Sequence, residues 1–298
     1  MSNRWRTQPE RGHHWAYQFM AWVALRVGRG PARMLLFPIC LYYLLFSSSQ
    51  TKAIKKFLER ACNRPAGLLD VFRHYHYFAS TILDRPFLLV GKDEQFHLTF
   101  HGTDLLLDRV DRGQGCILLG AHLGSFEVVR ASGLASRSVP IKLLMQEDQA
   151  PMLGEVLQKL DPSMSQSIIS IGAPDAMLQV KDCVEGGGLV GILGDRHGRN
   201  DKIVQCCFLG ELAPFPIGPM LLASLVKAPV ILFFGVYRGG CHYEIFFELF
   251  SEQVVLDRSR REASLQEWTQ RFVGRLEYYC RLAPHNWFNF YDVWEEDS

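Results

Sequence analysis

The stretch 115–130 has the sequence Gly-Cys-Ile-Leu-Leu-Gly-Ala-His-Leu-Gly-Ser-Phe-Glu-Val-Val-Arg. Its continuous apolar run, Cys116–Leu119, is typical of a strand that is covered on both faces. Gly120 and Gly124 bracket a turn, where the backbone needs positive φ or a substrate approaches closely. The stretch therefore predicts a buried strand followed by a tight turn and, after it, a helix.

The turn carries two residues that can act together. Ser125 can cap a helix over Phe126–Ala135. On one helix His122 and Glu127 would point about 140° apart, given ~3.6 residues per turn, so they meet only if His122 lies on the turn. An ionised Glu127 near the helix N-terminus could hold one imidazole nitrogen and leave the other as a general base. The spacing alone equally allows a purely structural role for both.

The composition indicates a folded domain with a basic N-terminal end. The chain has 298 residues, 48% of them hydrophobic and 12% aromatic, so it can bury a sizeable core. Residues 1–60 contain ten Lys and Arg and two Glu, whereas the whole chain has a net charge of only +1. A basic and apolar segment on a mildly acidic body favours an anionic membrane surface as partner over a nucleic acid. Eight scattered cysteines are typical of a reduced, cytosol-facing protein.

Two apolar stretches, Trp15–Val27 and Met34–Phe46, are each shorter than the ~20 residues that span a bilayer core. We expect a monotopic or shallow anchor in residues 1–62, without a signal peptide, and a catalytic domain in residues 63–298. Two ordinary core helices are the alternative. The anchor's expected membrane contacts are the aromatic residues Trp15, Trp22, Tyr42 and Tyr43 and the basic residues Lys52, Lys55 and Lys56.

The rest of the chain alternates strand-like and helix-like segments, which predicts an α/β fold with a mostly parallel sheet flanked by helices. The expected strands are 96–100, 116–119, 139–145, 167–171, 188–193, 230–237 and 242–249. The expected helices are 51–62, 68–83, 105–110, 126–135, 152–160, 175–184, 216–226 and 264–282. Functional residues collect at the carboxyl ends of such strands, where His122 and Asp195 both fall.

Other motifs narrow the chemistry. Asp195 and Arg196 follow a strand and could bind a phosphate or orient a catalytic group, or form a simple surface ion pair. The turn lacks the Gly-x-Ser-x-Gly of serine hydrolases, and no glycine-rich nucleotide loop is present, so we expect no cofactor. His97 and His101 are four apart without a third ligand close by in the sequence, and His74 and His76 face apart on a helix, so we expect no metal site.

Several blocks together resemble a known family. Gly-Ala-His122-Leu-Gly-Ser-Phe-Glu127 is similar to the His-x4-Glu/Asp signature of glycerolipid-type acyltransferases, above all the late (lauroyl/myristoyl) lipid A acyltransferases. The likeness continues through the strand ending at Asp195, the block 205–219, the strand after Ala228 and the closing Pro284-His-Asn-Trp287. It covers about residues 15–290, and it implies a glycerolipid acyltransferase-like fold.

The resemblance implies transfer of an acyl group from a thioester, usually on acyl carrier protein (or coenzyme A), to a lipid hydroxyl. His122 would be the general base, with Glu127 orienting it and backbone N–H groups near Ser125 stabilising the oxyanion. Gly124 and Ser125 would line the substrate site, with Arg196 contacting a phosphate or headgroup and Asp195 positioning it. The implied location is the cytoplasmic face of a bacterial inner membrane.

Two departures from the family pattern concern the acceptor. Leu144–Asp148 stands where the branch usually has an arginine, and Phe290–Trp294 replaces a basic closing segment. Both remove positive charge, so we expect an acceptor less anionic than lipid A, such as an amino-acid lipid, a lysophospholipid or an aryl polyene lipid. The residues also allow an acyl-thioester hydrolase or a non-catalytic lipid-binding protein.

Overall fold

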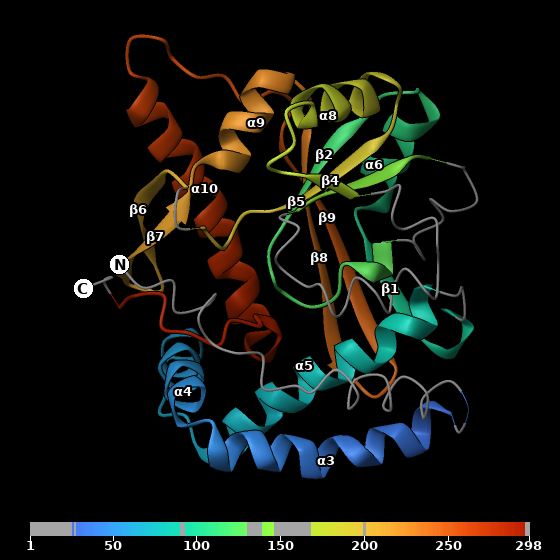
Figure 1. Cartoon of the computed structure of the whole chain (residues 1–298), viewed down its shortest axis with the longest axis vertical. Coiled ribbons are helices and arrows are strands. Elements are labelled where there is room, and N and C mark those ends of the chain that lie inside the picture. The colour runs from blue at the N-terminus through green and yellow to red at the C-terminus, as the bar shows by residue number, and fades with distance from the viewer. Residues whose placement is uncertain are drawn as a thin grey trace.

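A computed structural model describes residues 26, 28–89, 93–129, 139–145, 168–198 and 201–295. Its centre is a seven-stranded sheet in the order β1-β9-β8-β2-β5-β3-β4 (Figure 1). Strands β8, β2, β5, β3 and β4 run parallel, and β9 is antiparallel to β8 and parallel to β1. The strands are β1 His97–His101, β2 Cys116–Gly120, β3 Ile141–Met145, β4 Ile168–Ser170, β5 Leu189–Leu193, β8 Val230–Gly239 and β9 His242–Ser251. The predicted α/β fold with a mostly parallel sheet is confirmed.

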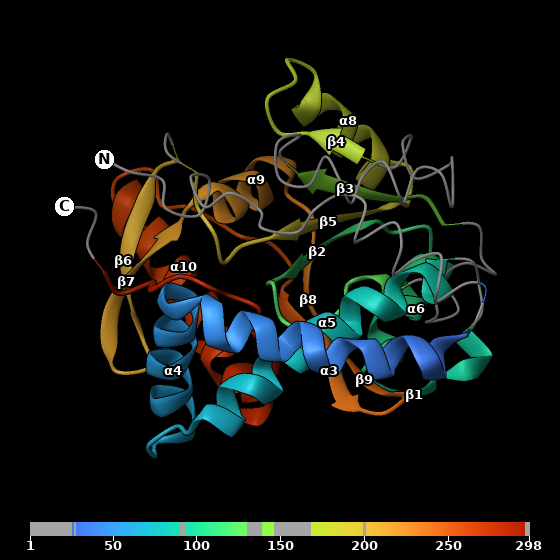
Figure 2. The same cartoon turned by 60° about the horizontal axis from the view of Figure 1, so that its bottom comes forward.

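Helices cover both faces of this sheet (Figures 1 and 2). They are α3 Arg29–Phe46, α4 Ser48–Cys62, α5 Leu68–Leu89, α6 Thr103–Asp111, α8 Ala176–Glu185, α9 Gly218–Val226 and α10 Arg261–Leu282. Short 3₁₀ turns lie at η1 Asp93–Gln95, η2 Glu127–Val129 and η7 Pro284–Asn286. The predicted helix 152–160 and most of the predicted helix 126–135 lie outside the described residues.

The alternation of side chains along the strands divides the core into two clusters. Ile117 and Leu119 of β2 point into a cluster with α4, α8, α9 and α10. Cys116 and Leu118 point the other way, into a cluster with α3, α6 and the second half of α5. All five residues of β2 are buried, as its uninterrupted apolar run predicts for a central strand.

A second, two-stranded sheet was not predicted. It consists of β6 Ile203–Phe208 and β7 Glu211–Pro216, which pair antiparallel. This ribbon packs on α10, where Cys207 N–H donates to Gln270 and Leu209 N–H to Glu277. Pro214 and Pro216 lie within β7, and proline is tolerated there because this ribbon leaves one edge of the strand unpaired.

The N-terminal helices are attached to the sheet domain by buried contacts. Phe57 of α4 lies against Trp287, with ring centroids 4.8 Å apart. Arg29 of α3 donates from Nε (2.7 Å) and one NH₂ (2.8 Å) to the buried carboxylate of Asp84 on α5. The predicted division at residue 62 stays a prediction, but the two sides of that boundary share one hydrophobic core.

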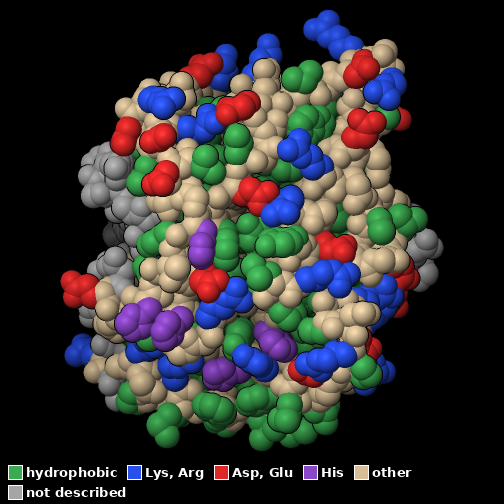
Figure 3. Space-filling model, turned by 180° about the vertical axis from the view of Figure 1, so that it is seen from behind, with side chains coloured by type: hydrophobic (Ala, Val, Ile, Leu, Met, Phe, Trp, Pro, Cys, Tyr) green, Lys and Arg blue, Asp and Glu red, His purple; other side chains and the backbone are tan. Residues whose placement is uncertain are grey.

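Helix α3 presents an apolar face to the surface. Its exposed side chains are Met34, Leu35, Phe37, Leu41, Tyr42, Leu45 and Phe46. Hydrophobic side chains gather at the lower edge of Figure 3, the edge at which Figure 1 places α3. Within the described residues no single helix has the length and apolar composition of a membrane span, although α3 and α4, bent by 96°, meet that test as a pair.

Candidate active site

The centre of the site is a histidine–aspartate pair formed by two neighbouring strands. His122 follows β2 and Asp195 follows β5, and these strands pair directly, so both residues lie at the same carboxyl edge of the sheet. Nδ1 of His122 is 2.9 Å from Oδ1 of Asp195, and the His122 backbone N–H donates to Oδ2 over 3.0 Å. The two contacts fix the imidazole ring relative to the backbone that carries it.

The pair has the electrostatics of an oriented base. Burial lowers the pKa of His122 below its ordinary value of 6.5, and the positive charge of Arg196 lowers it further, while Asp195 opposes both. Burial would raise the pKa of Asp195, but the charge of His122 and the hydrogen bond between them outweigh this and hold it below its usual range. An ionised carboxylate facing Nδ1 requires the proton on Nδ1, which leaves Nε2 with a lone pair. The side chain of His122 remains 26% accessible, so it can be reached from solvent.

A third residue, Trp287, completes the environment of Asp195. Its indole Nε1–H donates to Oδ2 over 2.9 Å, so both carboxylate oxygens of Asp195 accept hydrogen bonds. The backbone N–H of Phe288 donates to the carbonyl of His122 over 2.7 Å. Trp287 therefore supports the pair from the C-terminal segment. The sequence indicated Trp287 as part of a closing block but gave no signal for this contact.

The structure places Glu127 differently from the sequence-based expectation. Ser125 Oγ–H donates to Oε2 of Glu127 over 2.7 Å, and Nε of Arg85, on α5, lies 3.0 Å from Oε1. Within the described residues no hydrogen bond joins Glu127 to His122. The orienting role expected for Glu127 is taken by Asp195, which contacts Nδ1, because the turn directs the Glu127 side chain toward α5 instead of the sheet edge.

The backbone of the turn is also committed to structural contacts. The N–H of Gly124 donates to Asn286 O and that of Ser125 to Gly235 O, both over 2.8 Å, so neither is available for the expected oxyanion contact. Gly124 has φ +76°, and a Cβ there would overlap the carbonyl oxygen of Gly235. Ser125 is buried, and its hydroxyl binds Glu127 instead of capping a helix. These residues fix the turn against β8.

Arg196 lies beside the histidine–aspartate pair. One of its guanidinium NH₂ groups donates to the carbonyl of Phe288 over 2.6 Å, and its charge acts on His122. Its buried Nε has no partner among the described residues. The residues predicted for the site thus lie along one edge of the sheet, with His122 bound to Asp195 and Ser125 to Glu127. Gly124 and Arg196 instead donate to backbone carbonyls of the C-terminal segment.

One family model matches most of the chain. A family model described as bacterial lipid A biosynthesis acyltransferase matches residues 90–296, more than half of the chain. A comparison with curated proteins gave no match to the chain. The matched range contains β1 to α10 and both members of the histidine–aspartate pair.

Proposed function

The chain belongs to the bacterial lipid A biosynthesis acyltransferase family, and from this premise we propose that it transfers a fatty acyl group from a thioester to a lipid hydroxyl. The family implies an acyltransferase with an acyl donor and a lipid acceptor. The observation that carries our more specific proposal is the Nδ1–Asp195 contact of 2.9 Å, which leaves Nε2 of His122 as the base.

In the proposed reaction Nε2 takes the proton of the acceptor hydroxyl while its oxygen attacks the thioester carbonyl. The tetrahedral intermediate then expels the thiolate, and the imidazolium returns the proton to that sulfur, so no acyl-enzyme forms. Asp195 stabilises the imidazolium and keeps the ring in place. Glu127 acts indirectly in this scheme, since with Arg85 and Ser125 it fixes the turn that carries His122.

Arg196 and Gly124 complete the assignment. We assign Arg196 to an anionic group of a substrate, because its charge lies beside His122 and its Nε has no partner among the described residues. Gly124 keeps the backbone close to β8, where a side chain would not fit. Acyl carrier protein is the proposed donor partner, and coenzyme A thioesters are the alternative donor.

We further propose that residues 1–62 associate with the cytoplasmic face of the bacterial inner membrane and that residues 63–298 carry the chemistry. The exposed apolar side chains of α3 support this contact. Substituting Met34, Leu45 and Phe46 with serine should weaken binding to anionic vesicles at least ~10-fold, since each buried side chain contributes about 1.5–3 kcal/mol. The same substitution of Leu178, Leu212 and Val255, which are also well exposed but lie on other elements, is the control.

The acceptor is proposed to be less anionic than lipid A. In the segment that replaces the family's basic end, Asp292 pairs with Lys56 over 2.7 Å, and Arg60 pairs with Glu211 beside Trp294. Two basic side chains near this segment, Lys56 and Arg60, are therefore neutralised within the protein. Comparing lipid A precursors with amino-acid lipids, lysophospholipids and aryl polyene lipids as acceptors tests this, and a clear preference for the phosphorylated saccharide would contradict it.

The decisive experiment measures acyl-lipid product and free fatty acid together by mass spectrometry. Loss of the base in His122→Ala should lower acyl transfer ~10²–10⁴-fold. His101→Ala is the matched control, because His101 is exposed and stacks on Phe246 at the end of β1. Transfer near the wild-type rate in His122→Ala would refute the mechanism. Free fatty acid as the main product would favour the hydrolase, and no turnover with intact lipid binding would favour a non-catalytic role.

A further inference from the structure

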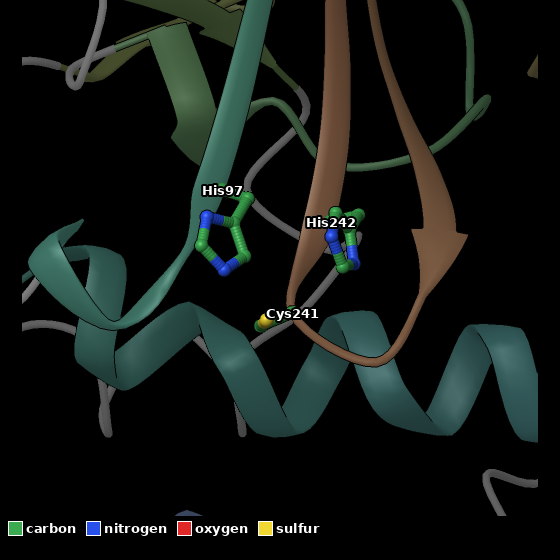
Figure 4. Close-up of side chains that lie close together, drawn as sticks. All are labelled: His97, Cys241 and His242. Carbon is green, nitrogen blue, oxygen red and sulfur yellow. The ribbon is translucent and has the colours of Figure 1, made fainter.

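Three residues that are potential metal ligands meet at the tip of the β8–β9 hairpin. His97 is the first residue of β1, Cys241 lies in the turn between β8 and β9, and His242 begins β9. His97 and His242 are direct partners in the parallel pairing of β1 with β9. Figure 4 shows the two imidazole rings facing each other, with the Cys241 sulfur beside them. The sheet thus supplies the partners for His97 that are missing from its sequence neighbourhood.

The geometry of the three side chains is close to that of a metal site. One ligand atom from each residue lies within 4.8 Å of the others, and the imidazole centroids are 4.8 Å apart. Around a tetrahedral Zn²⁺, with Zn–N of ~2.0–2.1 Å and Zn–S of ~2.3 Å, ligand atoms are about 3.3–3.6 Å apart. His97 and His242 are exposed and Cys241 is half-buried, so rotation of the side chains can close the remaining distance.

The backbone beneath these side chains is held by several contacts. The His97 N–H donates to the Cys241 carbonyl over 2.8 Å, which joins β1 to the turn. The guanidinium groups of Arg29 and Arg33 on α3 both donate to the carbonyl of Gly240. The positions of the three Cα atoms are therefore set by the fold, and only side-chain rotamers have to change when a metal binds.

We propose that His97, Cys241 and His242 bind one Zn²⁺ ion, with water at the fourth position. Two imidazoles and one thiolate form a donor set that binds Zn²⁺ well. Mg²⁺ and Ca²⁺ bind such a set poorly, because they prefer oxygen ligands. Binding releases the thiol proton of Cys241 to solvent, and the thiolate charge offsets part of the repulsion from the two nearby arginines. The site lies apart from the His122–Asp195 pair and does not depend on the proposed function. Its expected effect is to cross-link β1 to the hairpin.

The test uses the full chain and Zn²⁺ in competition with a chromogenic chelator. All proteins carry His13→Ala and His14→Ala, since that adjacent pair in the sequence is another source of imidazole. The variants are His97→Ala, Cys241→Ser and His242→Ala, and the controls are His101→Ala and Cys207→Ser. His101 lies on the same strand as His97, and Cys207 is an exposed free cysteine outside the cluster.

We expect one Zn²⁺ per chain and a higher thermal midpoint with the metal than without it. Each of the three variants should weaken binding by at least ~100-fold, because even loss of an outer-shell partner costs ~10–100-fold. Co²⁺ bound to the parent protein should show a thiolate-to-metal charge-transfer band. Cys241→Ser should abolish this band, and Cys207→Ser should leave it unchanged. Binding unchanged by all three variants, or a band that survives in Cys241→Ser, would overturn the assignment. Metal-free midpoints check that the variants remain folded.

Discussion

Asp195→Asn is the substitution that most directly tests how the base is oriented. The carboxylate accepts three hydrogen bonds, from the His122 ring, the His122 backbone and the Trp287 indole. Asparagine has nearly the same shape but only one oxygen. If that oxygen keeps the two bonds at Oδ2, its NH₂ group faces Nδ1 of His122. Nδ1 must then accept a hydrogen bond, so the proton moves to Nε2 and the base is lost.

The expected loss is large because the tautomer is wrong in nearly every molecule. Substitutions that switch a catalytic imidazole to the wrong tautomer in this way reduce kcat by ~10⁴-fold, which corresponds to about 5.5 kcal/mol of transition-state stabilisation. Trp287→Phe removes one donor at Oδ2 but leaves the Oδ1–Nδ1 contact in place. Its effect should therefore be much smaller, on the order of the 1–3 kcal/mol associated with one lost buried partner.

The assay compares acyl-transfer kinetics of Asp195→Asn with Glu127→Gln at equal, verified folding. Our structure predicts a loss of kcat in Asp195→Asn, whereas Glu127→Gln mainly weakens the ion pair with Arg85 and the fixation of the turn. Activity of Asp195→Asn within ~10-fold of wild type, with a collapse in Glu127→Gln, would refute the reasoning. It would show that the reacting state uses the His122–Glu127 contact expected from the sequence.

Three further predictions follow from the same geometry. The acid limb of the pH profile of kcat/KM should lie below pH 6.5, because burial lowers the pKa of His122. Arg196→Met should move this limb to higher pH, because it removes a positive charge that lowers the pKa of His122. Arg29→Ala should cost about 3–5 kcal/mol in denaturant unfolding because it leaves the buried Asp84 carboxylate without its cation. Arg64→Ala, at an exposed ion pair, should change the unfolding free energy far less. Gly124→Ala should lower the thermal midpoint more than Gly113→Ala, since both have positive φ but only Gly124 lies against another backbone.

The sequence predicted the centre of the main sheet well because β2, β5 and β8 are apolar and buried on both faces. Each described central strand appears within a few residues of its expected bounds, and α5 only extends further, to Leu89, across Pro86. The ribbon β6–β7 was not predicted, although the block 205–219 stood out. Burial alternates along β6, but its exposed and buried positions are both mostly apolar, so the sequence itself does not alternate. Burial does not alternate along β7, which also contains two prolines, so the local pattern does not indicate a strand there. The ribbon is held in place by contacts with α10, a helix that is remote from it in the sequence.

In the site, too, the sequence predicted local features but not contacts between residues that are far apart in the chain. Spacing correctly placed His122 on a glycine-bounded turn at a strand end. It could not identify the partner of Nδ1, because Asp195 is 73 residues away and is brought close only by the pairing of β2 with β5. The sequence did place Asp195 at a strand end, and the rule that such ends share an edge is the signal that could have joined the two residues.

The contacts of Glu127 connect the turn to the apolar face of the protein. Arg85, which binds Glu127, follows Asp84 on α5, and Asp84 binds Arg29 of α3. Two consecutive residues thus join the helix proposed to meet the membrane to the turn that carries the proposed base. Glu127→Gln should consequently alter KM for the lipid acceptor and the stability of the turn more than the tautomer of His122, while Asp195→Asn should lower kcat. A KM effect in Glu127→Gln that also appears in Arg85→Gln would show that the ion pair, and not the carboxylate alone, carries this role.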